Sequence, residues 1–161
     1  MSWCVLYVRS CCEKKVAQVC RTHGVAHYLP LRQETKIYQR RKVTVQLPLF
    51  KGYVFVDDDP EQRIHLHRTN QIIRWMQPEN ESVLRDQLEQ IRLALLADPR
   101  LEGPVAFRPG RRVRIKGGVF MGIEGVLGLR KGKSKVRLNV EMIAQSVALD
   151  VDADLIEFID D

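Results

Sequence analysis

The side chains best suited to metal or redox chemistry gather near the start of the chain. All four cysteines lie within the first 20 residues: Cys4, Cys11, Cys12 and Cys20. A structural zinc site needs two ligand pairs at short, regular spacings, whereas Cys11 and Cys12 are adjacent and the next histidines follow at irregular distances. We therefore expect reduced thiols that pack as small hydrophobic side chains, with no metal and no cofactor. A redox or zinc protein that uses this cluster is a less favoured alternative.

Acidic and histidine side chains elsewhere also lack a catalytic arrangement. Three consecutive aspartates, residues 57–59, precede Pro60, and this pattern is typical of a helix N-terminus rather than a calcium loop. His65 and His67 are two residues apart, so they diverge on a helix. The sequence has no G-x-S-x-G elbow and no Walker phosphate loop. These observations predict a binding protein and not an enzyme.

The most informative stretch is Q-L-P-L-F-K-G-Y-V-F-V-D at residues 46–57. Its β-branched and aromatic residues favour a strand. Alternate side chains of a strand point to opposite faces, so Tyr53 and Phe55 share one face while Val54 and Val56 share the other. One interpretation is a central strand covered on both faces; the other is a strand whose aromatic face receives a partner.

Three stretches resemble one protein family. P-L-F-K-G-Y-V-F-V resembles the signature of the NusG-type transcription elongation factors, usually written P-L-F-P-G-Y-V-F-V, with Lys51 in place of a proline. W-C-V-L-Y-V, at residues 3–8, is similar to the opening strand of the family. Residues 118–126 resemble the core of its KOW motif, which here contains Gly118, Phe120, Gly122 and Gly125. The stretches occur in the order typical of the family and cover almost the whole chain.

The resemblance implies an α+β fold in two domains. We expect an N-terminal NusG-type α/β sandwich with an antiparallel sheet at residues 1–97, a linker at 98–106, and a small SH3-like KOW β-barrel at 107–161. The linker segment contains two prolines and a glycine. Short strands between glycine-rich turns agree with a barrel rather than a helical hairpin; we expect them at 112–115, 125–129, 135–140, 145–149 and 155–159.

The N-terminal part has its own periodicity. Strands are expected at residues 3–8, 26–31, 53–56 and 72–76, with a hairpin at 35–46. A first helix should begin after Ser10, with Glu13 completing a capping box, and end before Gly24. A second should span residues 61–69, and a third should begin at the cap Ser82. In the third helix an apolar stripe recurs at helical spacing: Leu84, Leu88, Ile91 and Leu95.

The resemblance also implies a site. In the family the N-terminal domain docks through an aromatic patch onto the clamp helices of RNA polymerase and suppresses pausing. At matching positions the patch comprises Tyr7, Phe50, Tyr53 and Phe55. A second polymerase contact in specialised members corresponds to His65, Leu66, His67, Arg68 and Thr69. A solvated helix end is the alternative interpretation of this second segment.

The charge of the chain suits a nucleic-acid or acidic partner without proving one. The net charge is +6 and the pI is about 9.3. Arg9 matches a basic position that touches the non-template DNA strand in specialised members of the family. Basic side chains that could add phosphate contacts are Lys14, Lys15, Arg40, Arg41 and Lys42. The last three form the tip of the expected hairpin, for which a solvated turn is the alternative.

Family members use the KOW domain to recruit a termination factor or a ribosomal protein. Basic residues cluster at 108–116 and 130–135, and acidic residues cluster at 150–161. Mutual neutralisation of these charges within the barrel is the alternative to a role in partner binding. No apolar run reaches the roughly 18 residues of a membrane span, and the N-terminus lacks signal-peptide features. We expect a cytoplasmic, monomeric transcription elongation or antitermination factor, leaning towards an RfaH-like paralogue. The alternative is an RNA- or ribosome-binding KOW protein without polymerase binding.

Overall fold

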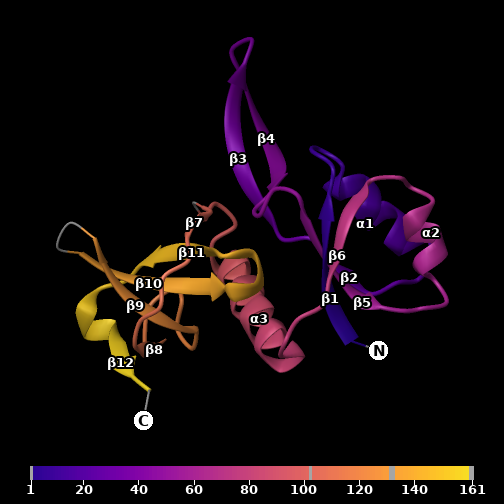
Figure 1. Ribbon diagram of the computed structural model, residues 1–161. Helices are drawn as coiled ribbons and strands as arrows, with labels where there is room; N and C mark the ends of the chain where they lie inside the picture. Colours follow the sequence, from indigo (N-terminus) through magenta and orange to yellow (C-terminus); the bar gives the residue numbers. More distant parts are fainter. Residues whose placement is uncertain (1, 102, 131–132, 160–161) are drawn as a thin grey trace. The chain divides into compact units, whose positions relative to one another are not determined.

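The computed structural model describes residues 2–101, 103–130 and 133–159. The chain forms two compact units, each built from two separate segments. Figure 1 labels the helices and strands of both units. The first unit comprises Met1–Pro30 and Phe50–Arg85, and the second comprises Leu31–Leu49 and Asp86–Asp161. This division differs from the single boundary expected near residue 97, because the hairpin and most of the last helix group with the C-terminal strands.

The first unit is built on a four-stranded antiparallel sheet in the order β2-β5-β1-β6. The strands are β1 (Ser2–Val8), β2 (His27–Tyr28), β5 (Tyr53–Asp58) and β6 (Ile72–Met76). Helices α1 (Glu13–Thr22) and α2 (Arg63–His67) belong to the same unit. Apolar side chains from the strands and both helices form one core, which includes Leu6, Val8, Val16, Cys20, Val54, Val56 and Leu66.

Strand β5 is covered on both faces, as one of the two sequence interpretations expected. Val54, Phe55 and Val56 are fully buried. Pairing is antiparallel on both sides of β5: His27 of β2 lies opposite Val56, and Val5 of β1 lies opposite Phe55. The run of β-branched and aromatic residues therefore belongs to an interior strand.

The start of helix α1 differs from the expected capping box. Cys12 occupies the N-cap position and makes no side-chain capping hydrogen bond, so the pairing of Ser10 with Glu13 is wrong. Glu13 is buried, and its carboxylate instead accepts a hydrogen bond from the backbone N–H of Gly52 at 3.4 Å. Glu13 therefore binds Gly52, which is distant in the sequence, and does not cap the helix.

The other two helices also begin at residues other than those expected. Asp59 accepts from the N–H of Glu61 at 3.1 Å, but the helical residues of α2 begin only at Arg63. Helix α3 (Glu81–Ala97) is capped by Asn80, whose side-chain oxygen accepts from the N–H of Ser82 at 3.1 Å. The apolar stripe of α3 is confirmed: Leu84, Leu88 and Ile91 are buried, and Leu95 is partly buried.

The second unit contains a hairpin and a six-stranded antiparallel sheet. The hairpin joins β3 (Leu31–Tyr38) to β4 (Arg41–Pro48), and the N–H of Gln33 ties it to the carbonyl of Pro99 at 2.7 Å. The sheet has the order β12-β8-β9-β10-β11-β7. Its strands are β7 (Val105–Ala106), β8 (Arg112–Ile115), β9 (Glu124–Arg130), β10 (Lys133–Val140), β11 (Gln145–Asp150) and β12 (Ile156–Phe158). Short 3₁₀ turns, Glu141–Ile143 and Ala153–Leu155, lead into β11 and β12.

All five expected barrel strands are present, and the α+β class is confirmed. Inward-facing side chains of β8, β10 and β11 form the core of the barrel, including Val113, Ile115, Val136, Leu138, Val147 and Leu149. The additional strand β7 lies inside the segment expected to be a linker and pairs with β11. Within the described residues, no helix is both long and apolar enough to cross a membrane.

Candidate functional site

Tyr7 and Tyr53 form an aromatic pair on one face of the first sheet. They lie directly opposite each other in β1 and β5, and their ring centroids are 5.2 Å apart with a 37° tilt. Cross-strand aromatic pairs at this spacing stabilise each other. The side chain of Tyr7 is 37 % exposed and that of Tyr53 is partly exposed, so the pair presents aromatic surface to solvent.

Gly52 makes the tyrosine pair possible. Its φ is +89°, and a Cβ atom added there would lie 3.0 Å from Cε1 of Tyr7. Only glycine combines this left-handed conformation with room for the ring. The N–H of Gly52 is held by Glu13, and its carbonyl accepts from the N–H of Val8 at 2.8 Å. Helix α1 and strand β1 together fix the turn that precedes β5.

Two of the four residues of the predicted patch have buried rings. Phe50 is 1 % exposed and Phe55 is 0 % exposed. Sequence alternation correctly placed Phe55 on the same face as Tyr53. It does not show which residues of that face are covered by other parts of the fold. Of the four patch residues, Tyr7 and Tyr53 are the two with exposed rings.

The histidine segment divides into exposed and buried members. Leu66 is 2 % exposed and belongs to the core, so direct contact of its side chain with a partner is excluded in this conformation. The ring of His65 stacks on His23 with centroids 3.7 Å apart, and the ring of His67 lies 5.2 Å from Trp75. The two histidines therefore diverge, as their spacing predicted. His67 and Arg68 are exposed, while Thr69 donates to the carbonyl of Leu66 at 2.7 Å.

Arg63 and Asp58 form a charged anchor at the start of α2. The guanidinium donates to both carboxylate oxygens of Asp58, whose side chain is 7 % exposed. These hydrogen bonds hold the pKa of Asp58 below its usual value, and they raise the pKa of Arg63. The same guanidinium lies 5.2 Å from the ring centre of Trp75, which adds a cation–π contact.

The basic residues predicted to contact nucleic acid lie in both units. In the first unit, Arg9 is exposed and donates to the carbonyl of Asn70 at 3.1 Å, while Lys14 and Lys15 are exposed in the first turn of α1. In the second unit, Arg40, Arg41 and Lys42 occupy the exposed hairpin tip.

The hairpin tip carries apolar surface that the basic motif did not reveal. Ile37 is 76 % exposed and Tyr38 is 70 % exposed. The turn residues Gln39 and Arg40 have φ values of +49° and +67°, the geometry of a tight two-residue hairpin loop without its usual glycine or asparagine. The sequence signal was the adjacent aliphatic and aromatic pair Ile37–Tyr38 next to the basic tip.

The KOW-motif residues shape one loop of the barrel. Gly118 and Gly122 flank the loop, and Phe120 lies between them, partly buried. Gly125 allows β9 and β10 to approach, because a Cβ atom there would lie 2.5 Å from the carbonyl oxygen of Arg137. Gly118 and Gly122 lie at a turn, as expected, whereas Gly125 serves strand packing inside β9. Val119 and Met121, which were not singled out from the sequence, are 72 % and 71 % exposed.

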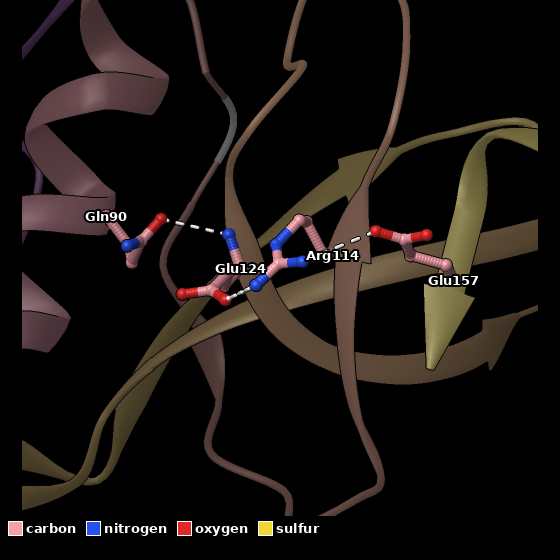
Figure 2. Close-up of polar contacts among 4 residues, drawn as sticks. All are labelled: Gln90, Arg114, Glu124 and Glu157. Carbon is pink, nitrogen blue, oxygen red and sulfur yellow. Dashed lines mark hydrogen bonds and ion pairs between the residues drawn. The ribbon is translucent and has the colours of Figure 1, made fainter. Parts of the chain in front are cut away.

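Several barrel charges neutralise each other. Arg114 lies between Glu124 and Glu157 (Figure 2). Its Nη2 is 2.9 Å from Oε1 of Glu124, and its Nη1 is 3.4 Å from Oε1 of Glu157. The N–H of Glu124 also donates to the side-chain oxygen of Gln90 in α3 at 2.9 Å (Figure 2). Lys135 pairs with Asp150. Asp150 and Glu157 lie in the C-terminal segment 150–161, whereas Glu124 lies outside it.

Comparisons with known proteins agree with these observations. Residues 1–92 match the family described as "Transcription termination factor nusG". The solved structure described as "Domain interaction in Thermotoga maritima NusG" aligns with a TM-score of 0.50 and 22 % identity, covering 99 % of this chain and 97 % of that chain.

Two further solved structures align at lower similarity. The "MjSpt4:Spt5 complex" in conformations B and A aligns at 16 % identity, with TM-scores of 0.31 and 0.30. These alignments cover 99 % and 98 % of this chain, and 97 % of the other chain in each case. None of the curated proteins compared gives a significant match. The family match alone covers more than half of the 161 residues, so the chain belongs to the NusG family of transcription factors.

Proposed function

We propose that this protein is a transcription elongation and antitermination factor that binds RNA polymerase through Tyr7 and Tyr53. The observation that carries the proposal is the exposed aromatic pair, held in a family-type sheet by Gly52 and Glu13. Rigid aromatic side chains are frequent interface anchors because they bury a large area with little loss of conformational entropy. The polymerase element is a pair of apolar clamp helices, against which the two rings pack.

Further contacts complete the proposed complex. His67 and Arg68 are the exposed members of the second polymerase contact. Arg9, Lys14 and Lys15 contact phosphates of the non-template DNA strand, and the basic hairpin tip adds a second phosphate-binding element. A factor attached at several points restrains the elongating complex in its active conformation and so suppresses pausing. The role requires binding alone, without catalysis by this chain.

The barrel recruits a second protein in this proposal. Val119 and Met121 form an exposed apolar surface on the loop between β8 and β9. A termination factor or a ribosomal protein docks on this surface, through contacts of the kind that bury apolar side chains at interface centres. The protein acts in the cytoplasm as a monomer, where transcription and translation both occur in a bacterial cell.

The test is a binding titration with purified core RNA polymerase in the absence of nucleic acid. The variant Tyr7→Ala/Tyr53→Ala removes both exposed rings. Loss of an anchor worth about 2 kcal/mol corresponds to a Kd roughly 30-fold higher. The matched control is Tyr38→Ala, which removes a more exposed tyrosine from the hairpin and should leave the Kd unchanged. Circular dichroism confirms that each variant is folded.

The same variants then enter an in vitro pausing assay. Wild-type protein should shorten the pauses, and the double variant should not at concentrations that saturate the wild type. Equal binding by wild type and Tyr7→Ala/Tyr53→Ala would disprove the site. Absence of binding by the wild type would disprove the polymerase role itself and favour the alternative of an RNA- or ribosome-binding KOW protein.

A further inference from the structure

The second unit contains a charged groove that none of the family motifs assigns. Its volume is about 780 Å³, within the range of roughly 300–1,000 Å³ typical of ligand sites. The outward face of β10 and β11 contributes to its lining, together with β7 and the segment that follows α3. Six charged residues line it: Asp98, Arg100, Arg108, Lys135, Arg137 and Asp150.

The side chain of Arg137 is fixed at the wall of this groove. Its Nη1 donates to the carbonyl of Ala106 at 3.0 Å, which ties the guanidinium to β7. The side chain passes over Gly128, where an added Cβ atom would lie 3.1 Å from Nε. Folding has already restricted the rotamers of Arg137. A ligand that accepts hydrogen bonds from its remaining N–H groups therefore loses little further side-chain entropy on binding.

The positive charge of the groove is only partly neutralised. Lys135 pairs with Asp150, and the carboxylate of Asp98 accepts from the backbone N–H of Arg100 at 2.9 Å. The guanidinium groups of Arg100 and Arg108 have no hydrogen-bond or ion-pair partner within the described residues, and both residues are exposed. Three guanidinium groups therefore share the groove with one unpaired carboxylate.

An aromatic side chain completes the lining. Phe120 contributes to the groove, whereas its neighbours Val119 and Met121 are exposed on the loop. The groove thus combines cations for phosphate, an aromatic side chain for stacking, and carboxylates that can accept hydrogen bonds from base amino groups.

We propose that this groove binds single-stranded nucleic acid. The guanidinium groups of Arg100, Arg108 and Arg137 contact successive phosphates, and an unpaired base stacks on Phe120. A nucleotide carries both an anionic phosphate and hydrogen-bond donors on its base, which match the mixture of cations and carboxylates. An acidic peptide offers anionic carboxylates but no nucleobase to stack on Phe120. The proposal concerns the second unit alone and does not depend on polymerase binding.

The test uses the full chain and a fluorescein-labelled single-stranded RNA of mixed sequence. Fluorescence anisotropy gives the Kd over a range of salt concentrations. All proteins carry Arg40→Gln, Arg41→Gln and Lys42→Gln, so that the hairpin tip does not mask the groove. The groove variant adds Arg100→Gln/Arg108→Gln, and the control adds Arg112→Gln/Lys116→Gln, which removes two exposed barrel cations outside the groove.

The groove variant should bind about tenfold more weakly, with a salt slope lower by about 1.4 for two lost phosphate contacts. The control variant should bind within about twofold of its parent. RNA containing 5-iodouridine should photo-crosslink to a peptide that includes Phe120. A parallel titration with single-stranded DNA identifies the strand: tighter binding of RNA points to a transcript, and equal binding points to any exposed single strand.

Three results would overturn the proposal. Equal losses in the groove and control variants would reduce the binding to a general effect of charge. A crosslink confined to other peptides would place the strand elsewhere. Tighter binding of polyglutamate or of duplex DNA than of the single strand would assign the groove to another class of macromolecule.

Discussion

Gly52 controls both the stability of the first sheet and the position of Tyr7. The variant Gly52→Ala must hold a side chain at a φ of +89° and also displace the ring of Tyr7. We expect the free energy of unfolding to fall by about 1–3 kcal/mol. Urea unfolding monitored by circular dichroism measures this loss, and the polymerase titration should show weaker binding in the same variant.

Gly24 provides the matched control for this prediction. It also has a positive φ, +68°, but a Cβ atom added there meets nothing within 4 Å. Gly24→Ala therefore carries the backbone strain without the clash at Tyr7. It should lose less stability than Gly52→Ala and keep its affinity for polymerase. Equal effects of the two substitutions would show that the ring of Tyr7 does not depend on Gly52.

Arg63 should make the first unit resistant to acid. The guanidinium lowers the pKa of Asp58, so the ion pair stabilises the fold fully above the usual pKa of 3.8 and loses this effect as the pH falls through the lower, folded-state pKa. Arg63→Gln removes the cause of the shift. The difference in unfolding free energy between wild type and variant should be largest near neutral pH and should shrink below pH 3.8. A difference independent of pH would contradict this account.

Residue types predicted the faces of strands better than they predicted partners. The alternation around Tyr53 placed the aromatic and valine faces correctly, because a strand has a fixed two-residue period. The prediction from local spacing was wrong for Glu13. Its distance from Ser10 fits a capping box, but its carboxylate accepts from the N–H of Gly52, 39 residues later. Such long-range hydrogen bonds leave no trace in local spacing.

At the scale of elements, helix α3 is joined to the barrel by two side-chain amides. Gln87 accepts from the N–H of Glu141 at 3.0 Å, and Gln90 accepts from the N–H of Glu124 at 2.9 Å. The two glutamines are three residues apart and so lie on one face of the helix. The contact replaces two solvent hydrogen bonds of the barrel backbone with protein ones.

Removal of both amides should be visible as faster amide exchange. In Gln87→Ala/Gln90→Ala, the N–H groups of Glu124 and Glu141 lose their acceptors, and we expect each lost hydrogen bond to cost about 0.5–1.5 kcal/mol. Hydrogen exchange should accelerate at these two amides and stay unchanged at Leu138, inside strand β10. Unchanged exchange at both glutamates would mean that the contact between α3 and the barrel is not maintained in solution.

The strands with a recognisable residue pattern were predicted, and the two-residue strand β7 was not. The barrel strand at Arg112–Ile115 and the strand at Ile72–Met76 have the expected bounds. Strand β7 was missed because two residues beside Pro104 show no alternation; its place is set by pairing with β11 and by Ser146, whose hydroxyl donates to the carbonyl of Ala106 at 3.1 Å. Strand β7 thus depends on its pairing with β11, which sequence periodicity does not show.

At the scale of the whole molecule, the order of the sequence motifs predicted the family and the α+β class. It did not predict that the hairpin segment Leu31–Leu49 groups with residues that follow Asp86. A segment inserted between two parts of another unit has no signature in composition, because its own strands pair only with each other. The division became visible only through tertiary contacts.

The order of strands in the first sheet also dictates when that sheet can form on the ribosome. Strand β1 pairs with β5 and β6, so Val5 meets Phe55 on one side and Met76 on the other. The nascent chain must therefore expose β1 without its neighbours until both later strands have emerged. Cys4, fully buried in β1, should react with a thiol reagent in shorter ribosome-bound chains and become protected once Met76 has left the exit tunnel. Before that point, the exposed strand is a natural target for chaperones.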